Sequence, residues 1–190
     1  MLLYGFTFFC VKFAVYSLLL WMPLFLTEEL SYSNSSIANI QSLYEVGTVI
    51  GAIVLGFVSD KFYSRRSPIG VLSILVSIFI SFYVTFNYAK LSFGWLASLM
   101  FCLGFFIGSL HHLICMTATA DLGRQQKGKR ATSTITGIVD GIGTTGSGLG
   151  QLVLGITVQT SGWRDGYLLV ISIVIAASML PMGRIFYREI

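Results

Sequence analysis

The charged residues of this chain fall into short groups, and the stretches between the groups are apolar and long. A helix that crosses a bilayer needs about 20 mainly apolar residues. Six stretches reach this length, at residues 2–26, 37–59, 68–88, 92–118, 132–159 and 167–186. The sequence therefore predicts an all-α membrane protein with six transmembrane helices, in which consecutive helices run antiparallel.

The composition excludes a water-soluble chain. Of the 190 residues, 55% are hydrophobic and only 11% are charged, whereas a soluble domain is about 25% charged. A disordered chain and a disulfide framework are excluded on this ground, and an ordinary cytosolic enzyme is not expected. Most of the surface is therefore expected to contact the lipid bilayer.

The Lys and Arg residues between the apolar stretches lie almost entirely on one side of the predicted membrane. Nine are on that side, namely Lys61, Arg65, Arg66, Arg124, Lys127, Lys129, Arg130, Arg184 and Arg188, against Lys90 and Arg164 on the other. Short loops rich in Lys and Arg stay in the cytoplasm. Both termini are therefore expected to be cytoplasmic, and the net charge of +4 reflects topology and no nucleic-acid partner.

Two local signals agree with this topology. The triplet Asn34-Ser35-Ser36 lies in a loop on the opposite side, which makes Asn34 a candidate N-glycosylation site. The N-terminal apolar stretch has no basic segment before it and no small-residue cleavage site, so it is expected to remain as a structural helix.

Three charged residues, Lys12, Glu45 and Asp140, lie inside the predicted helices. Each charge at this depth costs at least about 2.5–3.5 kcal/mol, so each is a candidate functional residue. Lys12 lies about 3 Å from the middle of its helix at 1.5 Å per residue, too deep for its stem to reach the membrane surface. It is either a cation that binds an anion in a transport pathway or one member of an ion pair with Glu45 or Asp140. Glu45 could instead hold a coupling proton or a hydrogen bond between helices.

Other apparent motifs do not indicate an enzyme. His111 and His112 are the only histidines, and neighbouring helical positions point about 100° apart, so no metal site is expected. One of the two could line a cavity. The Gly141–Gly146 stretch matches a dinucleotide-binding pattern, but it lies in a long apolar stretch and not between a strand and a helix. We expect neither an enzyme nor a cofactor.

The loop after the second apolar stretch resembles a known family signature. Gly56, Asp60, Lys61, Arg65 and Arg66 match the G-x-x-x-D-[RK]-x-x-x-[RK]-[RK] motif of the major facilitator superfamily. Plain topogenic charge would explain the arginines but not the glycine and the aspartate.

Further stretches narrow the resemblance. Residues 43–47, 108–113, 131–141 and 161–166 resemble the C-terminal half of the organophosphate:phosphate antiporter family, particularly its eukaryotic sugar-phosphate exchanger branch. The resemblance implies one six-helix half of a major facilitator bundle over residues 1–190, with a missing N-terminal six-helix half as its partner. In that family a basic residue on the first helix of each half grips the phosphate, and Lys12 takes that place here. The eukaryotic branch implies the endoplasmic reticulum membrane.

These observations lead to one main hypothesis, in which the chain belongs to a transporter that exchanges a sugar phosphate or glycerol phosphate for inorganic phosphate by alternating access. Lys12 would bind the phosphate, and Tyr44, Glu45, His111 and Asp140 would supply hydrogen bonds or set the charge. An empty site would leave the Lys12 charge uncompensated and would slow reorientation until phosphate returned. Two alternatives remain open: a half-length membrane protein that binds a partner or senses phosphate without transport, and a facilitator carrier for another organic anion.

Overall fold

In the computed structural model, which describes residues 2–61, 67–118 and 131–189, every regular element is a helix. The elements are α1 (Leu2–Glu28), α2 (Asn34–Lys61), α3 (Ser67–Asn87), η1 (Tyr88–Lys90), α4 (Phe93–Leu103), η2 (Gly104–Gly108), α5 (Ser109–His112), η3 (Leu113–Ala118), α7 (Ala131–Trp163), η4 (Arg164–Leu169) and α8 (Val170–Glu189). The predicted all-α membrane fold is confirmed.

Five stretches of the described chain are long and apolar enough to cross a membrane. The fifth, Ser133–Tyr187, has 55 residues and contains most of α7 and α8 together with η4. The chain reverses direction between these two helices at Gly162, whose φ of 77° lies in the left-handed region that glycine adopts without a steric cost. The count of six spanning helices stays a prediction.

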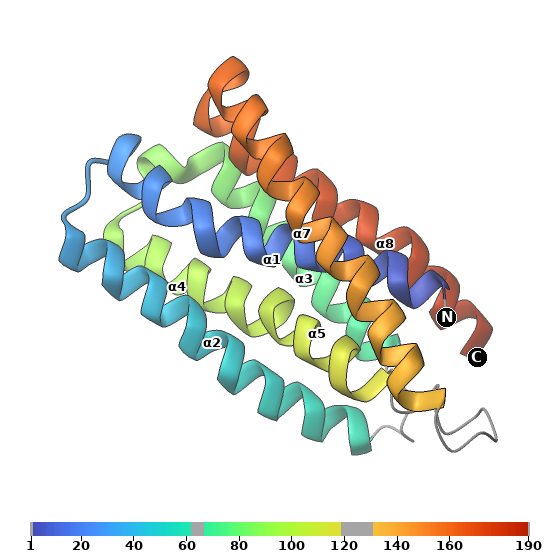
Figure 1. Cartoon of the computed structure of the whole chain (residues 1–190). Helices are drawn as coiled ribbons and strands as arrows, with labels where there is room; N and C mark the ends of the chain where they lie inside the picture. Colours follow the sequence, from blue (N-terminus) through green and yellow to red (C-terminus); the bar gives the residue numbers. More distant parts are fainter. Residues whose placement is uncertain (1, 62–66, 119–130, 190) are drawn as a thin grey trace.

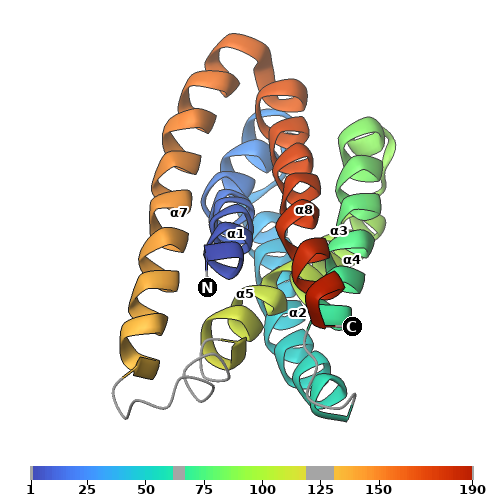
Figure 2. The ribbon, with the colours of Figure 1, turned by 90° about the vertical axis from the view of Figure 1, so that its right-hand side faces the viewer.

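Helix α1 lies at the centre of the bundle (Figures 1 and 2). It packs against α7 and α8 and, on its other side, against α2 and α5. Helix α3 packs against α8, and α2 runs along α4 and η2. The first residues of α1 and α7 and the last residues of α2 and α8 lie at the same end of the bundle (Figure 1). This arrangement places residues of α1, α5 and α7 that are distant in sequence next to one another.

Glycines allow α7 to approach α1 closely. A Cβ atom at Gly146 would come within 2.9 Å of the Phe9 ring, and one at Gly143 would come within 2.9 Å of the Lys12 side chain. Small residues at a helix crossing let two membrane helices approach until their backbones nearly touch. The polar side chains of α7 can therefore reach those of α1.

A second glycine contact joins α2 to the α4–η2 stretch. Cβ atoms at Gly47 and Gly51 would overlap backbone carbonyl groups of the α4–η2 stretch, and one at Gly104 would overlap the Tyr44 carbonyl. The Thr48 hydroxyl lies 3.3 Å from the Gly104 carbonyl oxygen and 3.1 Å from the Tyr44 carbonyl oxygen, and it can donate to either. The segment from Gly104 is π-helical, a geometry that often marks functional regions of α-helices.

A hydrogen bond between two hydroxyl side chains links α3 to α8, which pack against each other. Ser73, Ser77, Ser81 and Thr85 recur at every fourth residue of α3 and are all buried. The Thr85 and Ser172 hydroxyl oxygens lie 3.0 Å apart in a hydrogen bond between the two helices. Hydroxyl groups of this kind satisfy their own helix backbone and also link membrane helices.

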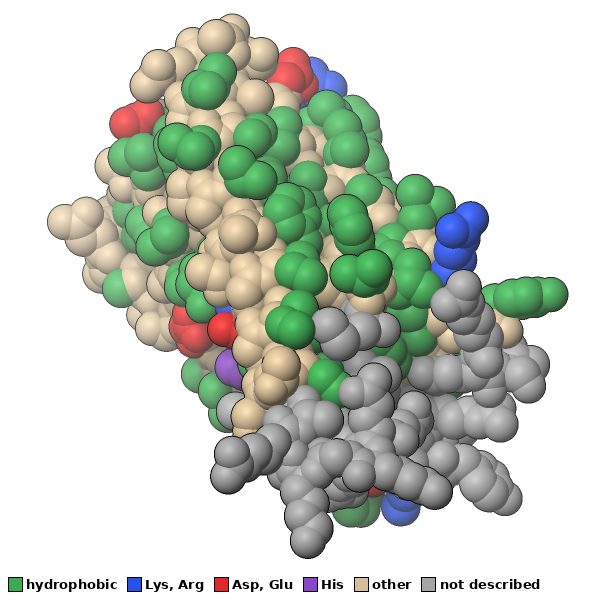
Figure 3. Space-filling view, turned by 45° about the vertical axis from the view of Figure 1, so that its right-hand side comes forward, with side chains coloured by type: hydrophobic (Ala, Val, Ile, Leu, Met, Phe, Trp, Pro, Cys, Tyr) green, Lys and Arg blue, Asp and Glu red, His purple; other side chains and the backbone are tan. Residues whose placement is uncertain are grey.

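The outside of the bundle is apolar, as a bilayer requires. Large side chains such as Ile53, Phe79 and Leu180 are 68%, 74% and 76% exposed. Hydrophobic side chains cover much of the described face in Figure 3. The chain is a multi-pass membrane protein.

Candidate functional site

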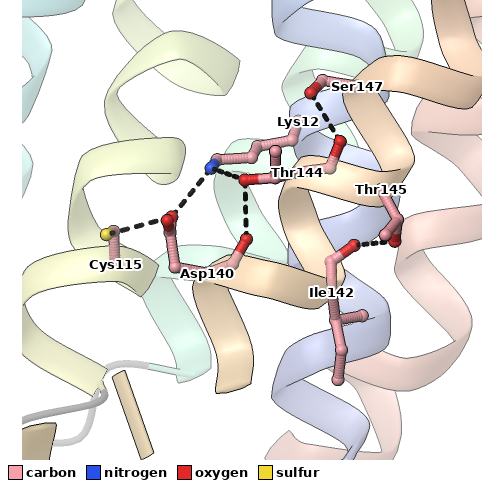
Figure 4. Close-up of polar contacts among 7 residues, drawn as sticks. All are labelled: Lys12, Cys115, Asp140, Ile142, Thr144, Thr145 and Ser147. Carbon is pink, nitrogen blue, oxygen red and sulfur yellow. Dashed lines mark hydrogen bonds and ion pairs between the residues drawn. The ribbon is translucent and has the colours of Figure 1, made fainter. Parts of the chain in front are cut away.

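Lys12 is the buried cation at the centre of the candidate site. Its residue is 6% exposed, and its Nζ lies 2.7 Å from Asp140 Oδ1 and 3.0 Å from Thr144 Oγ1 (Figure 4). Lys12 comes from α1, whereas both acceptors come from α7, where positions four residues apart share one face. Of the two ion pairs that the sequence allowed, the structure contains the one with Asp140.

Aromatic rings surround the ammonium group on the α1 side. Nζ lies 5.0 Å from the centre of the Phe8 ring and 6.0 Å from that of Tyr16. These two residues stand four positions before and after Lys12, which places all three on one face of α1. Ring faces attract a cation and stabilise the ammonium group without neutralising it.

His111 belongs to the same site. Its ring stacks on Phe8 at 5.3 Å between centroids and 15° between planes, and it meets the edge of Tyr16 at 6.0 Å. His112 packs edge-on against His111 at 4.9 Å and is itself exposed. In the described part of the chain, no group of three His, Cys, Asp or Glu residues could hold a metal ion.

The ion pair has one buried member and one open member. The Lys12 side chain is 7% exposed, whereas the Asp140 side chain is 46% exposed. Thr144 is also exposed, and a Cβ atom at Gly141 would meet no other atom within 4 Å. Acidic, basic and histidine atoms lie close together on the face seen in Figure 3. An anion could therefore approach Lys12 from the Asp140 side.

This pairing overturns one part of the mechanism inferred from the sequence. We expected an empty site to leave the Lys12 charge uncompensated, and that expectation is wrong for the state described here, because Asp140 already neutralises it. Obligatory exchange therefore cannot be argued from an uncompensated cation.

Tyr44 and Glu45 lie apart from this ion pair. Tyr44 is 1% exposed and packs in the apolar core. Glu45 is exposed on α2, and within the described residues its carboxylate has no hydrogen bond or ion pair. Tyr44 and Glu45 are consecutive in the sequence, but neighbouring positions on a helix point about 100° apart. The structure brings together Lys12, His111 and Asp140 from the predicted set, and it links neither Tyr44 nor Glu45 to Lys12 by a hydrogen bond in the described part.

Several residues of the site were not singled out from the sequence. Thr144, Phe8 and Tyr16 are each four positions from a residue that was, so helical spacing could have identified them. Cys115 could not have been found in this way. Its Sγ lies 3.9 Å from Asp140 Oδ1 and comes from η3, so that only the packing of η3 against α7 places it there.

Comparison with known sequences decides the family. The sequence profile described as the Major Facilitator Superfamily matches residues 4–189, almost the whole chain. The chain belongs to the Major Facilitator Superfamily. This superfamily consists of membrane transport proteins, and the chain is therefore not an enzyme.

Relatives within the Major Facilitator Superfamily carry exchanger names. Sugar phosphate exchanger 3 of Mus musculus is 32% identical over 165 residues, which cover 84% of this chain and 32% of the relative. The Homo sapiens protein of the same name is 33% identical, with the same coverage. Glucose-6-phosphate exchanger SLC37A2 of Mus musculus is 31% identical over 184 residues, 94% of this chain and 36% of the relative. The chain thus spans about a third of the length of these curated relatives. No solved structure matches it.

The loop motif that resembled the Major Facilitator Superfamily lies at the end of α2. Gly56, Asp60 and Lys61 are in its last turns, and Lys61 Nζ lies 5.1 Å above the Phe57 ring. Arg65 and Arg66 lie outside the described residues. The described part of the motif thus lies at the end of α2, within the residues that the family profile matches.

The candidate glycosylation residue, Asn34, is exposed at the first residue of α2. The preceding Ser33 supports this helix start, because the Ser36 backbone N–H donates to Ser33 Oγ at 3.4 Å. Asn34 lies at the opposite end of α2 from the loop motif, as the predicted topology requires. Its glycosylation stays a prediction.

Proposed function

We propose that this chain forms the C-terminal six-helix half of a Major Facilitator Superfamily transporter that exchanges a sugar phosphate or glycerol phosphate for inorganic phosphate by alternating access. The observation that carries the proposal is the buried cation Lys12, near the middle of the central helix and next to a half-exposed face. The relatives named as sugar phosphate and glucose-6-phosphate exchangers support the substrate class.

Lys12 would bind the phosphate group. An ammonium group carries three N–H donors and a full positive charge, and phosphate oxygens are strong acceptors of such charge-assisted hydrogen bonds. Lys12 is a point charge on a flexible stem and lacks the paired geometry of an arginine fork. The aromatic rings of Phe8 and Tyr16 would restrict where that stem can move, because they pack against the same face of α1.

Thr144 and His111 are polar groups beside this cation, Thr144 in direct contact with Nζ and His111 stacked on the Phe8 ring. The Thr144 hydroxyl can donate to a ligand oxygen when it does not donate to the Asp140 backbone carbonyl, at present 2.9 Å away. The His111 ring can donate or accept through its nitrogen atoms. These two residues would bind the sugar or glycerol portion, or orient the phosphate, whereas Glu45 and Tyr44 lie outside this cluster.

Alternating access requires two states of helix packing, and a second six-helix half must close the site from the other side. The glycine contacts between α1 and α7 and between α2 and η2 pack this half closely, which suits the movement of each half as a rigid body. The missing half would supply the second basic residue for the phosphate.

Topology and location are part of the same proposal. The nine-to-two distribution of Lys and Arg between the two sides supports cytoplasmic termini. The endoplasmic reticulum membrane is the location that the resemblance to the eukaryotic exchanger branch supports.

The test is phosphate exchange by the full-length protein reconstituted in liposomes that are loaded with inorganic phosphate. We expect Lys12→Ala to abolish uptake of labelled phosphate, whereas Lys12→Arg should retain part of it because the charge remains. Exchange that persists in Lys12→Ala at the wild-type rate would refute Lys12 as the phosphate ligand. A panel of organic anions as competitors distinguishes sugar phosphates from other cargo.

A further inference from the structure

The carboxylate of Asp140 occupies the position next to Lys12 that an anionic ligand would need. Its Oδ1 lies 2.7 Å from Nζ, a hydrogen-bonded ion pair at full contact. The Thr144 hydroxyl adds a second acceptor at 3.0 Å. A phosphate oxygen cannot take the place of Oδ1 unless Asp140 first leaves the ammonium group.

The surroundings of Asp140 permit this departure. Its side chain is 46% exposed on the surface of this chain, so a displaced carboxylate can turn away from Lys12 without entering the packed core. Lys12, in contrast, is held by α1 and by the rings of Phe8 and Tyr16. The titratable groups that face Asp140 in the described chain are few: the Lys12 ammonium group from α1, the His111 ring on α5 and the Cys115 thiol on η3.

We propose that Asp140 is an internal anion that competes with the ligand for Lys12, and that this competition makes the site selective for phosphate over carboxylate compounds. This inference rests on the proposed function and deepens it. A tethered group has an effective concentration in the millimolar range or above. A carboxylate in solution offers Lys12 the same chemistry as Asp140 without that advantage, so it does not displace Asp140.

A phosphate group displaces Asp140 because it carries more charge. A phosphate monoester bears about −1.5 to −2 at pH 7 and has three acceptor oxygens, against one charge and two oxygens for a carboxylate. Asp140 therefore lowers the affinity for every anion, but it excludes the weaker class. It also neutralises Lys12 when no ligand is bound, which removes an unpaired charge from the membrane interior.

The experiment replaces Asp140 in the full-length protein. We expect Asp140→Asn to lower the KM for inorganic phosphate about tenfold, because the ligand no longer has to displace a carboxylate that is hydrogen-bonded to the ammonium group. We also expect glucuronate, a sugar acid with a carboxylate, to become an inhibitor of phosphate exchange. Asp140→Glu should still exclude glucuronate, because it retains the competing charge.

A matched control removes a carboxylate elsewhere. Asp165 is 61% exposed in η4, with Arg164 as its neighbour at 3.9 Å, and Asp165→Asn should leave phosphate KM and selectivity unchanged. If Asp140→Asn folds but does not transport, phosphate binding is measured by thermal stabilisation in detergent, and the half-saturating concentration should again fall about tenfold. If Asp140→Asn does not accumulate, Asp140→Ser provides the same test with a smaller neutral residue.

Two outcomes separate this inference from the proposed function. An unchanged or raised phosphate KM in the neutral variants, with glucuronate still excluded, would overturn the role of Asp140 even when Lys12→Ala abolishes exchange. A wild-type protein that does not exchange phosphate would instead overturn the proposed function, and exchange that survives in Lys12→Ala at the wild-type rate would refute Lys12 as the phosphate ligand, whatever the Asp140 variants do.

Discussion

The contact between α2 and η2 should make the protein intolerant of a single methyl group at Gly104. A Cβ atom there would overlap the Tyr44 carbonyl oxygen. The same Cβ atom would lie 3.0 Å from the Tyr44 carbonyl carbon and 3.2 Å from the Thr48 backbone nitrogen. All three obstructing atoms belong to the backbone of α2, so no side-chain rotation can relieve the overlap. Gly104→Ala must therefore push the two helices apart.

The magnitude follows from three contributions. Overpacking of this kind costs about 1–3 kcal/mol, and the upper part of the range applies because the clash is with backbone. Separation of the helices also weakens the bond between the Thr48 hydroxyl and the Gly104 carbonyl, worth about 0.6 kcal/mol in a membrane protein. The better helix propensity of alanine offsets up to about 1 kcal/mol. The net loss is about 2–3 kcal/mol.

Thermal unfolding of the full-length protein in detergent, followed by size-exclusion chromatography with fluorescence detection, measures this loss. At roughly 2 °C per kcal/mol for a large chain, the midpoint should fall by about 4–6 °C. Gly94→Ala is the matched control, because a Cβ atom at Gly94, earlier in the same helical stretch, would meet nothing within 4 Å. A midpoint for Gly104→Ala equal to that of Gly94→Ala would refute the claim that α2 and η2 touch through their backbones.

Two further predictions concern the site and the topology. His111→Phe should keep the stacking on Phe8 and the wild-type melting temperature but raise the KM for a sugar phosphate, because the ring nitrogens are lost; an unchanged KM in uptake assays would remove His111 from the ligand contacts. Asn34→Gln should abolish a glycan-dependent shift on gels after expression in eukaryotic cells, and a wild-type chain that migrates identically before and after glycan removal would contradict the predicted placement of that loop.

The helices and the charged residues within them could be predicted from the sequence for one physical reason. Membrane helices must hydrogen-bond their own backbones and expose apolar side chains to lipid. A spanning helix can therefore be recognised from about 20 consecutive, mainly apolar residues. Lys12 and Asp140 stood out because a charge in such a stretch needs a partner or water. The bounds of α1, α2 and α3 differ from those of the predicted apolar stretches by at most three residues at either end.

The choice of partner for Lys12 could not be made in this way. Glu45 and Asp140 are both carboxylates near the middle of predicted helices, and hydropathy says nothing about the direction in which a helix turns its side chains. Glycines at the α1–α7 contact, including Gly143 and Gly146, fix that direction for α7. The hydroxyl residues at every fourth position of α3 can be seen in the sequence. The hydrogen bond between Thr85 and Ser172 of α8 cannot, because it depends on the packing of two helices that are distant in sequence.

The exposed carboxylate of Glu45 restricts what can surround this face of α2 in the full-length transporter. Lys12 and Asp140 neutralise each other, so Glu45 is the charge from the predicted core that the described residues do not pair. It is exposed on α2 among Val46, Val49 and other apolar side chains that are also exposed. A carboxylate in contact with hydrocarbon would cost several kcal/mol. We therefore expect this face of α2 to border protein or water in the full-length transporter, which is where a second six-helix half with its own basic residue would lie.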